Sequence, residues 1–121
     1  MYRTETKRTT KLPTGVYTST VTEIDYDPEY MNDEAFFVRY KLVNENGVEY
    51  DHHELFFNTW ENDRTAELFE YWERNGIPHD EIHMFKGCHE ELTFKKTVKN
   101  NSSQLVITCR KFLGHPEEET A

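Results

Sequence analysis

Residues 62–78, NDRTAELFEYWERNGIP, have the pattern of one complete amphipathic helix, whereas most other segments of the chain alternate like strands. Asn62 or Asp63 can accept a backbone N–H at the start of this helix. Gly76 suits the left-handed position that ends many helices, and Pro78 prevents continuation. The apolar side chains recur at helical spacing and predict one buried stripe: Thr65, Leu68, Phe69 and Trp72.

The segments around this helix have the composition and the period of β-strands. Dense β-branching favours a strand at 16–26, where Ile24 falls out of phase with Val21 and predicts a bulge near 22–23. The Asn-Gly pair at 46–47 favours a hairpin turn, because both residues take positive φ cheaply. We therefore expect five strands, at 16–26, 35–43, 48–57, 85–98 and 102–113.

The order of these elements predicts the fold class. Five strands with one helix between the third and the fourth is the order of the oligonucleotide/oligosaccharide-binding (OB) barrel, a mainly β fold. The helix would cover the open end of a closed five-stranded barrel. We expect a flexible basic arm at 1–11, one OB domain at 12–113 and an acidic tail at 114–121.

Charge is distributed unevenly along the chain, whose formal net charge is −9. Residues 23–34 hold six acids and no base, whereas residues 90–111 hold five bases and two acids. Net negative charge disfavours indiscriminate binding of nucleic acid, because neutralisation of phosphates drives such binding. A local basic face remains compatible with nucleic acid, and a surface that is merely well solvated is the simpler alternative.

The two cysteines, Cys88 and Cys109, do not form a CxxC pair, and no signal peptide or long apolar segment is evident. These features favour a reducing, cytoplasmic setting and no membrane partner. Cys109 lies in the apolar run LVITC, so we expect it in the core. A Cys88–Cys109 disulfide is the alternative.

The run LPTGVYTSTVTEID, at 12–25, resembles the opening of a family of small proteins from phages and mobile elements of Gram-positive bacteria. The stretches GVEYDHHELFF, NGIP and FKGCHEELTFKKT follow in the family's order, so the resemblance covers about 12–112. Its motifs are structural glycines and core positions. The resemblance implies an OB-fold protein of the single-stranded-DNA-binding type, with a role in DNA replication or recombination.

A candidate nucleic-acid surface follows from strand alternation. If Phe36, Val38 and Tyr40 face inward, the intervening residues of that strand form an outer face with an aromatic ring between cations. If Leu92, Phe94 and Val98 bend inward, basic residues of the fourth strand are exposed as well. The candidate contacts are Phe37, Arg39, Lys41, Lys95, Lys99 and Arg110. An ordinary solvated strand face is the alternative.

Neither a metal site nor a catalytic site is predicted. His52 and His53 are adjacent and would diverge in a strand, and the spacing of His79 and His83 matches no zinc pattern. The acidic segment 23–34 lacks the EF-hand pattern. No P-loop, dinucleotide fingerprint or nucleophile elbow occurs, so we expect no enzyme activity and no cofactor.

Two functional hypotheses follow. The first is a non-catalytic protein that binds single-stranded DNA in the replication or recombination of a phage or mobile element. The alternative is an acidic adaptor, or an inhibitor, of a DNA-processing protein, with segments 23–34 and 61–81 engaging a basic partner surface. The sequence leaves open whether the chain forms a homo-oligomer.

Overall fold

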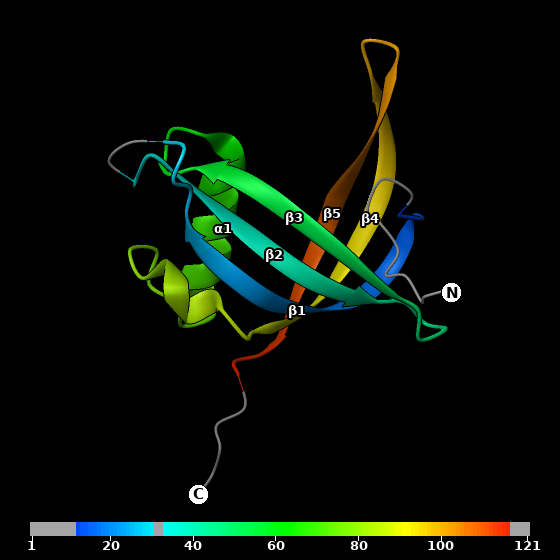
Figure 1. The fold of residues 1–121 in the computed structure, drawn as a ribbon, viewed down its shortest axis with the longest axis horizontal. Helices are drawn as coiled ribbons and strands as arrows, with labels where there is room; N and C mark the ends of the chain where they lie inside the picture. The colour runs from blue at the N-terminus through cyan, green and yellow to red at the C-terminus, as the bar shows by residue number, and fades with distance from the viewer. Residues whose placement is uncertain (1–11, 31–32, 117–121) are drawn as a thin grey trace, which may run out of the picture.

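The computed structural model describes residues 12–30 and 33–116 (Figure 1). The predicted basic arm at 1–11 lies outside the described residues, as does most of the predicted acidic tail. The last strand ends at Gly114, the first residue of the predicted tail. Among the described residues, no helix has the length and apolar character needed to cross a membrane.

The described residues form a mainly β structure, with five antiparallel strands and one α-helix, as predicted. The strands pair in the order β3-β2-β1-β4-β5. The α-helix α1 follows β3, and a short 3₁₀ helix, η3, leads into β4. The bounds are β1 Gly15–Tyr26, β2 Ala35–Val43, β3 Glu49–Phe57, α1 Asp63–Arg74, η3 Ile82–Phe85, β4 His89–Lys99 and β5 Ser102–Gly114.

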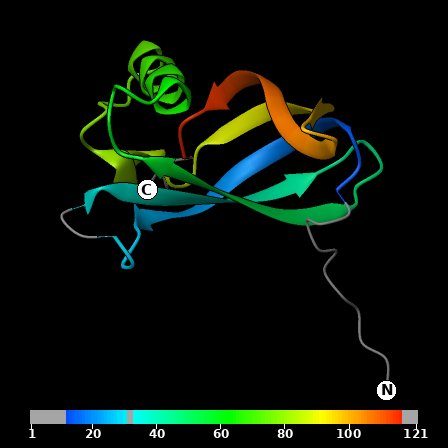
Figure 2. The same ribbon diagram turned by 90° about the horizontal axis from the view of Figure 1, so that it is seen from above.

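The predicted closed barrel is wrong, because the sheet curls strongly but stays open (Figure 2). β3 and β5 are its two edges, and among the described residues no strand pairs with their outer sides. We call the gap between these two edges the seam. Charged side chains on β3 and β5, Glu54 and Arg110, meet across the seam. A side-chain contact therefore stands where a closed barrel would have backbone hydrogen bonds.

The bulge predicted in β1 is confirmed. The register with β2 shifts between Val21 and Glu23, so Val21 and Ile24 both face the core. Val21 also bonds through its backbone to the turn before β4, with Val21 N donating to Cys88 O at 3.0 Å. A bulge bends its strand and increases the local twist, so it contributes to the strong curl of the sheet along β1.

Local sequence signals define both ends of α1, as predicted. The Asn62 side chain accepts from the backbone N–H of Thr65 at 3.1 Å. Gly76 takes a φ of +85°, and Ile77 N donates to Trp72 O at 2.9 Å. This 6→1 hydrogen bond across a left-handed glycine is the Schellman pattern. The helix therefore begins and ends where its caps dictate.

Replacing Asn62 with alanine is expected to lower the free energy of unfolding by about 1 kcal/mol, because the N-terminal N–H groups lose their side-chain acceptor. Urea denaturation measures the change, with Glu61→Ala as an exposed neighbouring control. An Asn62→Ala variant with the midpoint of the control would contradict the capping role.

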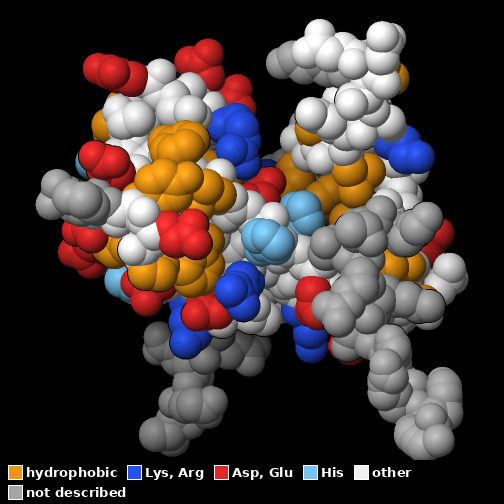
Figure 3. All heavy atoms as spheres, turned by 45° about the horizontal axis from the view of Figure 1, so that its top comes forward, with side chains coloured by type: hydrophobic (Ala, Val, Ile, Leu, Met, Phe, Trp, Pro, Cys, Tyr) orange, Lys and Arg blue, Asp and Glu red, His pale blue; other side chains and the backbone are white. Residues whose placement is uncertain are grey.

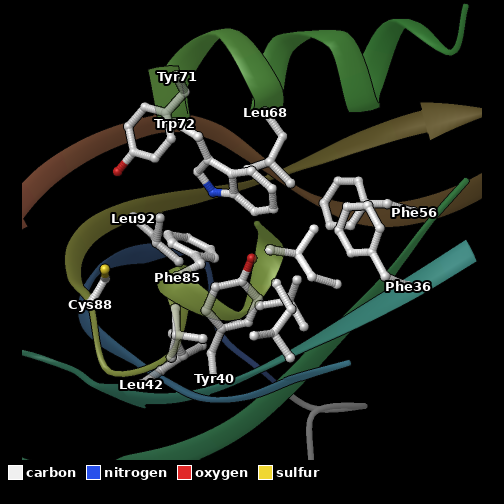
Figure 4. Packing of buried hydrophobic residues seen from close by; sticks show 14 of the residues in the cluster. Phe36, Tyr40, Leu42, Phe56, Leu68, Tyr71, Trp72, Phe85, Cys88 and Leu92 are labelled. Carbon is white, nitrogen blue, oxygen red and sulfur yellow. The ribbon is translucent and has the colours of Figure 1, made fainter. Parts of the chain in front are cut away.

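The apolar stripe of α1 is buried in the core, as predicted (Figure 4). Trp72 has no exposed surface and packs against Phe36 and Phe85, with ring centroids 5.8 and 5.0 Å apart. Phe36 also stacks on Phe56 of β3. Large rings of this kind bury roughly 150–250 Å² each. They compensate for the low content of aliphatic residues and fix α1 against the curled sheet.

The distal part of the β4–β5 hairpin extends beyond the rest of the sheet as an arm (Figure 1). β1 pairs with β4 only as far as Phe94, so β4 has β5 as its sole partner beyond that residue within the described chain. Asn100 and Asn101 form the turn with positive φ. Val98 was predicted to face inward, but its side chain is 77% exposed because no core lies beneath the arm.

The expectation that Cys109 lies in the core is also wrong. Cys109 is exposed opposite Thr93, next to a register shift in the β4–β5 ladder, whereas Cys88 is buried. Both thiols are free, so the alternative of a Cys88–Cys109 disulfide is not realised. Burial raises the pKa of the Cys88 thiol to about 11, which keeps it protonated at neutral pH.

Candidate nucleic-acid interface

The β4–β5 arm carries positive charge in a chain whose formal net charge is −9. No Asp or Glu occurs from Lys95 to Gly114, and three lysines lie between Phe94 and the turn. Lys95 and Lys96 are exposed, whereas the side chain of Lys99 lies outside the described part. Because side chains alternate along a strand, Lys95 and Lys96 point to opposite sides of the arm. The arm therefore presents ammonium groups on both of its sides.

The predicted β2 residues do lie on the outer face of the sheet, but acids surround them. Phe37 is half-buried, and Arg39 and Lys41 are exposed. Their cross-strand partners include three acids: Asp25 and Glu23 of β1 and Asp51 of β3. Arg39 Nε lies 3.5 Å from a carboxylate oxygen of Glu23. The guanidinium of Arg39 lies 5.2 Å from the centre of the Phe37 ring, so it covers part of that ring.

The register connects this outer face to the arm. Lys41 lies opposite Thr20 of β1, and Val16 of β1 lies opposite Thr93 of β4, two residues before Lys95. Directly opposite residues share a face of the sheet, so Lys41 and Lys95 lie on the same side. Lys111 of β5, opposite Glu91, is an exposed cation on that side which the sequence analysis did not select.

Arg110, the remaining predicted contact, lies on the inner side of the sheet. Its guanidinium donates to Glu90 Oε2 at 3.0 Å and to Glu54 Oε1 at 3.0 Å. It also donates to the Tyr40 hydroxyl at 3.2 Å, and that hydroxyl donates to Glu54 Oε1 at 2.9 Å. We call these four residues the Arg110 clasp. Their mutual contacts leave Arg110 poorly placed to meet a phosphate.

Within the clasp, the pKa values of the two carboxyl groups are shifted in opposite directions. Burial would raise the pKa of Glu54, but His52, Arg110 and Arg64 outweigh burial and lower it to about 2. Burial raises the pKa of Glu90 despite Arg110, and its side chain has no exposed surface. Glu90 Oε1 has no hydrogen-bond partner among the described residues. Neighbouring side chains therefore lower the pKa of Glu54, whereas burial raises the pKa of Glu90.

Only the alternation of side chains along β4 could have predicted that Glu90 faces inward, because residues 90, 92 and 94 point to the same side of the sheet. Its partner Arg110 on β5, and the clasp residues of β2 and β3 that contact Arg110, could not be found from periodicity, because they are far away in the sequence.

A cleft of about 660 Å³ lies along the seam, between α1 and β5. Seven consecutive β5 residues, 104–110, line it, so the free edge of β5 forms one wall. Figure 3 shows the arm rising on one side of a hollow in this surface. The charged side chains that line the cleft are balanced in sign: Arg64, Arg74 and Arg110 against Glu54, Glu67 and Glu70. Charge alone therefore gives the cleft no preference for phosphate.

Neither a protein-family model nor a curated protein sequence matches this chain. The resemblance to small phage proteins therefore stays a prediction from the sequence. Among the described residues, no three His, Cys, Asp or Glu side chains are grouped so that they could hold a metal ion.

Proposed function

We propose that this chain is a non-catalytic module that binds single-stranded DNA, with the β4–β5 arm as the principal contact. The observation that carries the proposal is the stretch 95–114, which contains no acid in a chain with a formal net charge of −9. A general excess of charge would not produce this segregation. Exposed lysines on a projecting hairpin can approach phosphates while the acidic body stays at a distance.

The fold supports the same ligand class. The strand order and the strong curl resemble those of an OB module, although the seam between β3 and β5 is open. OB modules bind oligonucleotides on the face of their second and third strands and on the loop between the fourth and fifth. In this chain those elements are the outer face of β2 and the arm. The sequence resemblance is the reason for assigning the ligand to DNA replication or recombination.

The proposed path of the strand runs from the arm onto the outer face of the sheet. Lys95, Lys96 and Lys99 would meet phosphates first, and Lys111 and Lys41 would continue the path. Phe37, half-buried beside Arg39, offers a ring on which a base can stack. The acids next to Arg39 and Lys41 weaken the β2 part of the path. The arm therefore dominates affinity, and Phe37 contributes a secondary contact.

A double variant of the arm tests this proposal. Lys95→Ser/Lys96→Ser removes two phosphate contacts, so the slope of log affinity against log salt should become shallower by about 1.4, at about 0.7 per phosphate on single strands. The control, Arg74→Ser/Lys86→Ser, removes the same charge from exposed positions on α1 and next to η3. Fluorescence anisotropy with a labelled oligothymidylate measures both slopes.

Equal slopes for the arm variant and the control would mean that net charge, not the arm, governs binding. No detectable binding of wild-type protein at low salt would end the proposal itself.

A further inference from the structure

The end of the sheet where β1 and β3 finish and β2 begins exposes large aromatic side chains. Phe57, the last residue of β3, is 47% exposed, and Trp60 in the β3–α1 connection is 45% exposed. Tyr30 of the β1–β2 connection packs edge-on against Phe57, with ring centroids 5.8 Å apart. We call these three residues the aromatic end. The other exposed apolar residues, such as Val16, Met84 and Leu113, are aliphatic, and single ones are ordinary on a protein surface.

The rings of the aromatic end are held in place from behind. Trp60 packs edge-on against Phe69 of α1 and against His79, with centroid distances of 5.0 and 5.1 Å. The two connections are joined by a backbone hydrogen bond from Asn58 N to Glu34 O at 2.7 Å. An aromatic surface that is already ordered loses little side-chain entropy when a partner covers it.

Carboxylates surround the aromatic end. Neither connection, DPEYMNDE at 27–34 or FNTWEND at 57–63, contains a lysine or arginine. Figure 3 shows hydrophobic side chains on the lobe that carries the β1–β2 loop, with acidic side chains and some Lys or Arg side chains around them. The exposed or half-buried acids of these connections that the structure describes are Asp27, Glu29, Asp33, Glu34, Glu61 and Asp63. A phosphate backbone would be repelled here, so this end does not extend the proposed DNA path.

We propose that the aromatic end docks a segment of a partner protein that is rich in arginine or lysine and carries some apolar residues. Charge complementarity selects this occupant: aromatic faces attract guanidinium and ammonium groups, and the surrounding carboxylates pair with the same groups. Arginine serves this role best, because it stacks on rings and bonds carboxylates in a fork. Trp60 and Phe57 are the anchors of the interface, and the carboxylates give orientation and association rate.

This docking site is separate from the arm. β1 pairs with β4 at its beginning and meets the aromatic end only at its finish, so the two surfaces lie at different ends of the sheet (Figure 1). The inference does not depend on DNA binding. If both hold, the chain attaches a basic partner protein to a single strand.

The test uses a fluorescein-labelled peptide of alternating arginine and leucine, and a second peptide with glutamate in place of arginine. Anisotropy should show that the wild-type chain binds the arginine peptide and not the glutamate peptide. Trp60→Ala should weaken binding roughly tenfold or more, as expected for an anchor. Trp60→Phe, which keeps a ring, should stay within about twofold of wild type, and so should Val48→Ala, a control at the far hairpin.

A second pair of variants covers the case in which Trp60→Ala loses its fold. Glu34→Gln/Glu61→Gln should weaken binding of the arginine peptide several-fold more than Glu45→Gln/Glu49→Gln, which removes the same charge near the β2–β3 hairpin. Three results would overturn the inference: equal binding by Trp60→Ala and wild type, equal binding of the two peptides, or equal weakening by the two glutamine pairs. Affinity for oligothymidylate should be unchanged in Trp60→Ala, and a parallel loss there would assign this end to nucleic acid instead.

Discussion

Replacing Arg110 with methionine is expected to lower the free energy of unfolding by about 3–5 kcal/mol, the usual cost of removing one partner from a buried ion pair. Glu90 has no exposed side-chain surface, and Arg110 is its only cationic partner among the described residues. Glu54 would keep Arg64, but that contact is longer, at 3.7 Å. The same substitution also removes the contact that joins β3 to β5 across the seam.

Urea denaturation at neutral pH measures this loss. The control is Arg39→Met, which removes an exposed arginine from a pair with Glu23 and should cost at most about 1 kcal/mol. Adding Glu90→Gln to the Arg110→Met variant should restore part of the stability, because the unpaired buried charge is gone. Equal losses for Arg110→Met and Arg39→Met would contradict the clasp.

The Arg110 variant also separates the two roles proposed for that residue. If Arg110 binds only within the clasp, folded Arg110→Met protein should keep its affinity for single-stranded DNA. If Arg110 contacts a phosphate, as the sequence analysis predicted, affinity should fall and the salt slope should become shallower by about 0.7. Anisotropy on protein shown to be folded by circular dichroism distinguishes these results.

Acid should destabilise the protein through Glu54, by up to about 3 kcal/mol. The pKa of Glu54 is lowered in the folded state from 4.5 to about 2, and one pKa unit corresponds to about 1.36 kcal/mol. A lowered folded-state pKa gives stability that is fully present above the unfolded value and is lost as pH falls through the folded value. We therefore expect the loss between about pH 4.5 and about pH 2.

The contribution of Glu90 to the free energy of unfolding should depend on pH in the opposite direction. Its pKa is raised in the folded state by burial, so it favours folding below its unfolded value, and this contribution is lost as pH rises through the raised value. Glu54→Gln should flatten the acid limb of the stability profile, which is the fall in unfolding free energy between about pH 4.5 and about pH 2. Glu90→Gln should remove the fall in unfolding free energy that occurs as pH rises through the raised pKa of Glu90. Urea denaturation at several pH values measures both profiles. A Glu54→Gln variant with the wild-type acid limb would contradict the assignment.

Local signals were sufficient to predict α1 and most strand positions. The helix caps lie within a few residues of the helix they end, so Asn62 and Gly76 could be identified without knowing the fold. The bulge in β1 was visible because Val21 and Ile24 differ in phase. In each case one stretch of sequence contains all the groups that interact, and the structure confirms the prediction.

Other features depend on how distant segments pair, and local signals could not predict them. They are the open seam, the clasp, and the exposure of Val98 and Cys109. Periodicity could place Glu90 inward, but its contact with Arg110 depends on the β4–β5 register, and the pairing of β2 and β3 is needed to add Tyr40 and Glu54. An apolar run such as LVITC does not reveal that β5 is an edge strand with no partner on one side. The side of the sheet on which Arg110 lies also depends on a register shift in the β4–β5 ladder, which periodicity does not reveal.

The most direct test of the proposed function is to map a single-stranded oligothymidylate onto the chain by nuclear magnetic resonance at low salt. We expect amide shifts to concentrate in the β4–β5 arm, at the beginning of β1 and around Lys41, and to fade as salt is added. The aromatic end should be unaffected. Shifts centred on Phe57 and Trp60, or no shifts at all, would contradict the account.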